Sequence, residues 1–112
     1  MKDETIILRK MVEYIRQAQE YVKEHCFESF MADNKTIYAA AFAICQFSEL
    51  TQQLKEETRQ AYSAIPWAQI RGIRNRIVHN YDSVDFKILW NIIKSDLPKL
   101  EQEIGKMLGN IL

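Results

Sequence analysis

The sequence predicts an all-α fold, and two features of its composition and patterning carry that prediction. The 112 residues include only three glycines and two prolines, whereas Glu, Lys, Gln, Leu and Ala, which favour helices, recur along the chain. Apolar residues also return at three- and four-residue steps, the period of an amphipathic helix. A chain of this length supports one hydrophobic core. We therefore expect residues 1–112 to form a single domain, an antiparallel bundle of four to five helices.

The first helix is expected from about residue 3 to residue 24. Its inward-facing residues are Leu8, Met11, Ile15, Ala18 and Val22. The segment FESFMADN that follows is too short for a full helix, but one turn could press Phe27, Phe30 and Met31 onto the core. Asp33 or Asn34 would then cap the next helix, because a short polar side chain can accept a bond from a free amide at a helix start.

A second helix is expected from about residue 35 to residue 58. Its inward stripe comprises Ile37, Ala40, Ala41, Ile44, Phe47, Ser48 and Leu54. A third helix should begin near Pro66, which suits a first helical turn, and continue to Tyr81. Asp82 or Ser83 can cap a fourth helix. Its inward residues are Val84, Ile88, Ile92 and Ile93, and Pro98 demands a kink or a restart after Asp96.

The segment RNRIVHNY, residues 74–81, carries the chemically distinctive side chains. On a continuous helix, one side is apolar and consists of Trp67, Ile70, Ile73 and Ile77. Arg71, Asn75 and His79 follow at four-residue spacing and form a polar stripe roughly opposite. The third helix therefore presents a polar quadrant rather than a scattered polar surface.

This segment is also basic within a neutral chain. The protein has 15 basic and 15 acidic residues, yet residues 58–81 contain no Asp or Glu and include Arg59, Arg71, Arg74 and Arg76. Guanidinium groups present paired donors to phosphate oxygens. We interpret the segment as a local site for a phosphate chain, with Arg71 and Arg76 as phosphate-positioning or surface groups.

Arg74 and His79 would lie about 140° apart around one helix, too far to act as a simple pair. If two such helices packed across a two-fold axis at Gly72, two arginines and two histidines would converge in one cleft. Histidine can take a proton from a ribose 2′-hydroxyl and return it to the leaving 5′-oxygen, while arginine stabilises charge on the phosphate. The pattern thus favours a homodimer that cleaves RNA without a metal.

The motif resembles that of the HEPN superfamily, and more closely that of its HepT-like toxins, whose signature is Arg-x-x-x-x-His-x-Tyr. Arg74, His79 and Tyr81 match it, the flanking segment IPWAQIRGIRNRIVHNYDSVDFKILWNIIKSDLPKL is also similar, and the similarity in length and helix layout covers essentially the whole chain. The resemblance implies a HEPN-like, homodimeric, metal-independent endoribonuclease that needs no cofactor. Arg74 and His79 would be catalytic and Asn75 would assist.

The resemblance also implies a partner. Family members are typically encoded beside a small MntA-like nucleotidyltransferase antitoxin, which transfers AMP from ATP to the motif tyrosine, here Tyr81. An alternative function remains open, in which the chain is a non-catalytic helical module that binds a minimal nucleotidyltransferase or its nucleotide substrate. His79 could also be a helix-terminal histidine favoured by the helix dipole.

Other features indicate a cytoplasmic protein. The chain has no apolar stretch long enough to span a membrane, and the acidic start MKDETIILRK is unlike a secretory signal. Cys26 and Cys45 form no CxxC pair, so we expect buried thiols rather than a disulfide. His25 beside Cys26 lacks zinc-ligand spacing, and Trp67 and Trp90 are expected to anchor the core or an interface.

Overall fold

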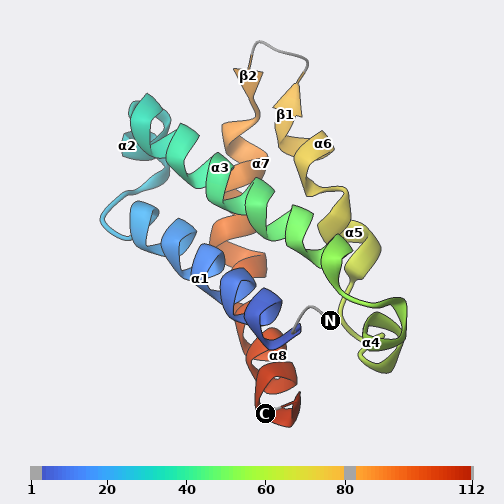
Figure 1. The fold of residues 1–112 in the computed structure, drawn as a ribbon. Helices are drawn as coiled ribbons and strands as arrows, with labels where there is room; N and C mark the ends of the chain where they lie inside the picture. The colour runs from blue at the N-terminus through green and yellow to red at the C-terminus, as the bar shows by residue number, and fades with distance from the viewer. Residues whose placement is uncertain (1–3, 80–82, 112) are drawn as a thin grey trace.

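A computed structural model of the chain describes residues 4–79 and 83–111, and it has the predicted all-α architecture (Figure 1). The elements in chain order are α1 (Glu4–Val22), α2 (Phe27–Met31), α3 (Asn34–Leu50), the 3₁₀ turn η1 (Thr51–Gln53), α4 (Glu56–Ala61), α5 (Trp67–Arg71), α6 (Ile73–Ile77), β1 (Val78–His79), β2 (Ser83–Val84), α7 (Phe86–Asn91), the π-helical turn η2 (Ile92–Asp96) and α8 (Leu97–Ile111). The two short strands form one antiparallel ladder. Apart from that ladder, the regular structure of the described residues is helical.

The long helices enclose one core. α1 and α3 lie side by side and antiparallel, while α7, η2 and α8 run in one line behind them (Figure 1). The core receives the inward stripes predicted for the first two helices. The five residues predicted to face inward on the first helix and the seven predicted on the second are all buried. Their periodic spacing is sufficient to place them, because residues three and four apart share a helix face.

The link between the first two long helices follows the prediction in part. α2 is a single short helix with Phe30 fully buried and Phe27 half-buried, but Met31 is 41% exposed and does not join the core. Asp33 caps α3, because its carboxylate accepts the Thr36 amide at 3.1 Å and the Thr36 hydroxyl at 2.8 Å. These two bonds lower the pKa of Asp33, the hydroxyl bond having the larger effect.

The predicted continuous helix over residues 35–58 is wrong at its C-terminal end. α3 stops at Leu50, η1 follows, and the backbone is extended at Leu54 and Lys55 before α4 begins. Contacts from elsewhere satisfy the backbone at this break: the Glu4 carboxylate accepts the Lys55 amide at 2.6 Å, and the Arg59 guanidinium donates to the carbonyls of Thr51 and Leu54. The break lets Leu54 turn into the core.

The predicted third helix is also shorter than expected. α5 begins after Pro66 as predicted, but α6 ends at Ile77 and Val78 adopts extended angles of φ −106° and ψ 115°. Val78 then pairs with Val84 and His79 with Ser83, and the Asp85 amide donates to the Ile77 carbonyl at 2.6 Å. Both valines pack against the core, so the β-branched residues favour a ladder over a further helical turn.

The fourth predicted helix begins later and breaks where expected. Its cap is Asp85, which accepts the Ile88 amide at 3.0 Å, and neither Asp82 nor Ser83. Ser83 belongs to β2, and Asp82 lies outside the described residues. Ahead of Pro98 the chain forms the π-helical turn η2 and restarts as α8. Ile92 and Ile93 are buried, whereas Val84 and Ile88 are half-buried.

The cysteines depart in part from the prediction. Both are free thiols, but Cys26 is exposed at the start of α2 and only Cys45 is half-buried. Burial raises the pKa of Cys45; the positive charge of Arg74 opposes this shift and Glu49 adds to it.

Candidate functional site

The motif begins on the last turn of α6. Arg74 is exposed there, and its charge acts on Cys45 of α3, as does the charge of Glu49. Arg74 therefore faces solvent beside the second half of α3. An exposed guanidinium in this place can receive an incoming phosphate.

His79 does not continue the polar stripe predicted for the third helix. It lies in β1, two residues past the end of α6, where its backbone pairs with Ser83. An extended residue advances the chain about 3.3 Å instead of 1.5 Å. The predicted angle of 140° between Arg74 and His79 thus does not apply, because the two residues lie on different elements.

Arg71 and Asn75 are both exposed, but they lie on two short helices and not on the single helix that the sequence predicts. Arg71 is the last residue of α5, and Asn75 is in α6. Gly72 lies between the two short helices, with angles of φ −83° and ψ −2°. Arg71 also lines a cleft with Arg59 and Trp67.

Arg76 faces a different part of the molecule. It lines a cleft of about 420 Å³ between α5–α6 and α8. Asp96, Lys99 and Glu103 line the same cleft, so acidic groups there offset its positive charge. The structure therefore separates Arg76 from the side on which Arg71 and Asn75 lie.

Two interactions that the sequence does not reveal fix α5, the helix that precedes the motif. The buried hydroxyl of Ser48 on α3 donates to the carbonyl of Ile70 at 2.7 Å and lies 3.3 Å from that of Arg71. Trp67 donates its indole N–H to the carbonyls of Arg59 and Tyr62 at 3.0 Å each. Arg59, counted with the phosphate-binding arginines from sequence, instead holds the η1–α4 turn through the bonds described above.

Tyr81, the predicted modification site, lies outside the described residues, as does the side chain of His79. What the structure fixes is the frame around them: the end of α6, the Val78–Val84 pair and the Asp85 cap. In that frame Arg74 and the backbone of His79 stand on either side of the helix-to-strand transition.

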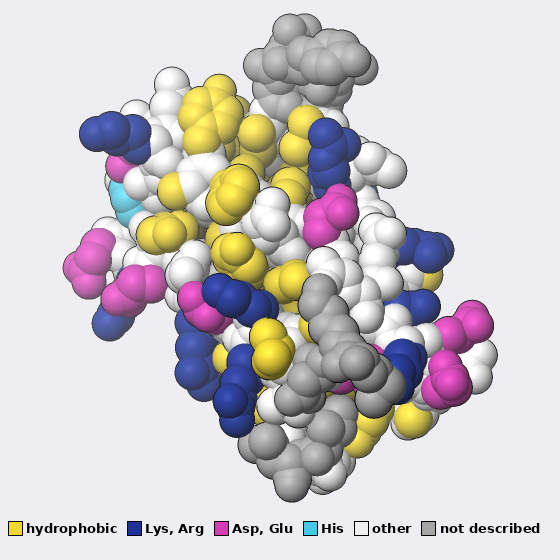
Figure 2. Space-filling model, viewed as in Figure 1, with side chains coloured by type: hydrophobic (Ala, Val, Ile, Leu, Met, Phe, Trp, Pro, Cys, Tyr) yellow, Lys and Arg dark blue, Asp and Glu magenta, His cyan; other side chains and the backbone are white. Residues whose placement is uncertain are grey.

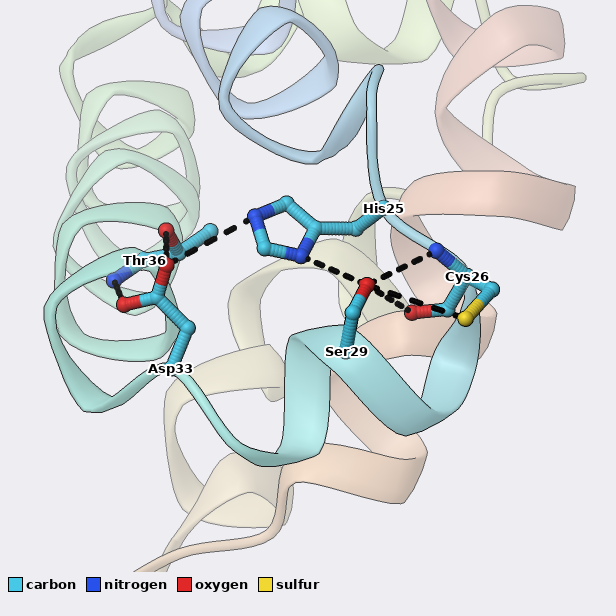
Figure 3. Close-up of polar contacts among 5 residues, drawn as sticks. All are labelled: His25, Cys26, Ser29, Asp33 and Thr36. Carbon is cyan, nitrogen blue, oxygen red and sulfur yellow. Dashed lines mark hydrogen bonds and ion pairs between the residues drawn. The ribbon is translucent and has the colours of Figure 1, made fainter.

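The second histidine belongs to a structural cluster at the start of α2 and α3 (Figure 3). His25 places Nδ1 2.9 Å from the Ser29 hydroxyl and Nε2 3.6 Å from the Asp33 carboxylate. The order Asp, His, Ser suggests a nucleophile, but the Ser29 hydroxyl donates to the Cys26 carbonyl and accepts the Cys26 amide. It thus caps α2. Among the described residues, no group of three or more His, Cys, Asp or Glu side chains is placed to hold a metal ion.

The surface around the motif is mixed in charge. Figure 2 shows Lys and Arg side chains dispersed among Asp and Glu, with hydrophobic side chains gathered over α3. None of the described helices has the length and hydropathy that a membrane span requires. Any binding of phosphate at the motif would therefore depend on a few local arginines.

The fold and the motif define a HEPN-type helical domain, and the family comparison agrees. The model of the family described as "Ribonuclease HepT-like" matches residues 11–107. The chain belongs to this ribonuclease HepT-like family.

Curated relatives cover nearly the whole domain. "Probable ribonuclease HepT" from Thermococcus cleftensis is 30% identical over 100 residues, covering 89% of this chain and 91% of the relative. A protein from Caldanaerobacter subterraneus subsp. tengcongensis named "Putative RNase TTE0752" is 31% identical over 104 residues, covering 89% and 93%. No solved structure matches the chain significantly.

Proposed function

We propose that this protein is a metal-independent endoribonuclease whose catalytic residues are Arg74 and His79. One observation carries the proposal: in a chain of the ribonuclease HepT-like family, an exposed arginine lies in α6 and a histidine follows five residues later on β1. The RNA substrate is proposed on the same ground.

The chemistry needs only these two side chains. His79 takes the proton of a ribose 2′-hydroxyl, and the 2′-oxygen bonds to the adjacent phosphorus as the bond to the 5′-oxygen breaks. The imidazolium then gives its proton to the departing 5′-oxygen. Arg74 stabilises the charge that builds on the non-bridging oxygens. The products are a 2′,3′-cyclic phosphate and a 5′-hydroxyl.

Arg71 and Asn75 support this site by position. Both are exposed, Arg71 at the end of α5 and Asn75 next to Arg74 in α6, where Arg71 can hold a neighbouring phosphate and Asn75 can donate to one. Arg76 remains a candidate RNA contact, although its cleft also contains Asp96 and Glu103.

The active form is proposed to be a homodimer, in which two copies of the motif meet in one cleft. The support is chemical. Each copy supplies one arginine and one histidine, which lie on different elements, and a two-fold axis would bring two arginines and two histidines into one cleft. The cellular role proposed with this activity is that of a cytoplasmic toxin.

The test is RNA cleavage in EDTA by the wild-type protein beside His79→Ala and Arg74→Ala, with circular dichroism as the check on folding. Removing a general acid–base or the charge stabiliser should slow cleavage roughly 10²- to 10⁴-fold. Arg71→Ala should chiefly weaken RNA binding, with a smaller dependence on salt. Wild-type cleavage by folded His79→Ala would refute the assignment.

The proposed regulator is an MntA-like nucleotidyltransferase antitoxin that adds AMP to Tyr81. Tyr81 follows Arg74 by seven residues in the sequence, and an AMP on it would add bulk and a negative charge to the segment proposed to bind RNA. Co-expression should therefore raise the intact mass in steps of one AMP, and Tyr81→Phe should stay toxic beside the antitoxin. Full neutralisation with an unmodified Tyr81 would mean that the antitoxin acts by binding alone.

A further inference from the structure

The outer face of α3 carries aromatic side chains that the bundle does not cover. Phe42 is 61% exposed and Tyr38 is 56% exposed, the highest values among the large apolar side chains of the described residues. Both residues belong to α3, over which Figure 2 shows hydrophobic side chains gathered. Burying such a pair away from water would stabilise an assembly by the hydrophobic effect.

These aromatics belong to a regular stripe. The α3 stripe consists of Lys35, Tyr38, Phe42, Cys45 and Glu49. Its spacing of three, four, three and four residues confines it to about 80° of the helix surface. That alternation is typical of a helix that packs along another helix. The core-facing residues Ile37, Ile44 and Phe47 lie on the other side of α3, so the stripe is a second packing face.

The two ends of the α3 stripe carry opposite charges at equal distances from its centre. Lys35 precedes Phe42 by seven residues and Glu49 follows it by seven, which is about 10.5 Å in each direction along the helix. A two-fold axis near Phe42 would lay a second α3 antiparallel to the first. Each Lys35 would then lie opposite Glu49 of the second copy, so the stripe is complementary to itself.

The stripe also adjoins the motif. Arg74 and Glu49 both act electrostatically on Cys45, a member of the stripe, and α6 packs on α3. A two-fold axis through this face would bring both copies of Arg74 to the same side of the assembly.

We propose that the α3 stripe is the surface by which a second copy of this chain docks, antiparallel and centred near Phe42. The inference identifies the interface of the dimer in the proposed function. It depends on that function only for the role of the cleft that the two copies share. It places the centre of the interface on α3 and not at Gly72.

The first test is the mass of the full chain in solution by light scattering at micromolar concentration, without RNA. The wild type should have twice the chain mass of 13.2 kDa. Phe42→Glu, which introduces a charge at the centre of the interface, should have the mass of one chain. Tyr21→Glu is the matched control, because Tyr21 is 41% exposed on α1 outside the stripe, and it should stay dimeric.

The second test exchanges the end charges. Lys35→Glu and Glu49→Lys should each weaken the dimer roughly tenfold, because each creates two like-charged contacts. The double variant should restore wild-type affinity, which a merely structural effect of either change would not do.

The outcomes separate this inference from the nuclease assignment. A wild-type monomer, a dimeric Phe42→Glu variant or an unrestored double variant would each overturn the α3 interface. None of these results depends on cleavage, whereas the nuclease assignment is judged by His79→Ala in EDTA.

Discussion

Individual side chains around the motif divide between those that hold the chain and those that face solvent. Ser48, 2% exposed, fixes the end of α5, and Arg59 satisfies carbonyls at the η1–α4 turn. Arg71, Arg74 and Asn75 are exposed on the neighbouring turns. The buried hydroxyl thus positions a short helix whose outer side chains are available to a ligand.

Gly72 offers a prediction at this scale. A Cβ at Gly72 would lie 3.6 Å from the Ala68 carbonyl oxygen and 3.7 Å from that of Gln69, which are ordinary contacts, and the backbone there is near-helical. Gly72→Ala should therefore raise the free energy of unfolding by about 0.5–1 kcal/mol, since it restricts the unfolded chain. Urea denaturation measures this. A loss of stability or of the dimer would instead place Gly72 in a close contact between copies.

The sequence identifies the motif residues but does not distinguish the roles of the arginines. Arg59, Arg71 and Arg74 lie in one segment without acidic residues, so composition alone gives all three the same expected role. What separates them is tertiary: the bonds of Arg59 to Thr51 and Leu54, and the exposure of the other two. Ser48 appears in sequence only as a small residue on an inward stripe, and its bond to Ile70 spans 22 residues.

At the scale of elements, the helix interiors follow from periodicity and the helix ends do not. The core faces of α1 and α3, the Asp33 cap and the restart before Pro98 were predictable from local pattern. The stops at Leu50 and Ile77 depend on distant partners: Glu4 binds the Lys55 amide, and β2 pairs with β1. Such contacts leave no local signal.

The break between α3 and α4 gives a pH prediction. Burial alone would raise the pKa of Glu4, but bonds from the Lys55 amide and the Thr58 hydroxyl, with the charges of Lys55 and Arg59, lower it below 4.5. A carboxyl with a lowered folded pKa stabilises the fold above its unfolded pKa, and this stability is lost as the pH falls through the folded value.

Glu4→Gln should therefore cost about 1 kcal/mol at neutral pH and flatten the stability profile below about pH 4.5. Denaturant unfolding at a series of pH values tests both effects. Glu20→Gln, on the exposed side of the same helix, is the control and should keep the wild-type profile. An unchanged profile in Glu4→Gln would show that Glu4 does not hold the break.

At the scale of the whole molecule, the balanced charge is informative. With 15 basic and 15 acidic residues, and basic and acidic side chains interspersed on the face in Figure 2, general attraction to nucleic acid is weak. In the proposed dimer, RNA affinity would come from Arg71, Arg74 and the second copies of these residues. Assembly through the α3 stripe would double the local charge without changing the net charge of the chain.

The most direct measurement of the central claim uses one oligonucleotide in two forms. The wild-type protein is incubated in EDTA with a single-stranded RNA that it cleaves, and with the same oligonucleotide carrying a 2′-deoxyribose at the cleaved position. We predict cleavage of the RNA to a 2′,3′-cyclic phosphate and no cleavage at the deoxy position, because the attacking hydroxyl is missing. Cleavage of both forms at the same position and rate would contradict the mechanism assigned to Arg74 and His79.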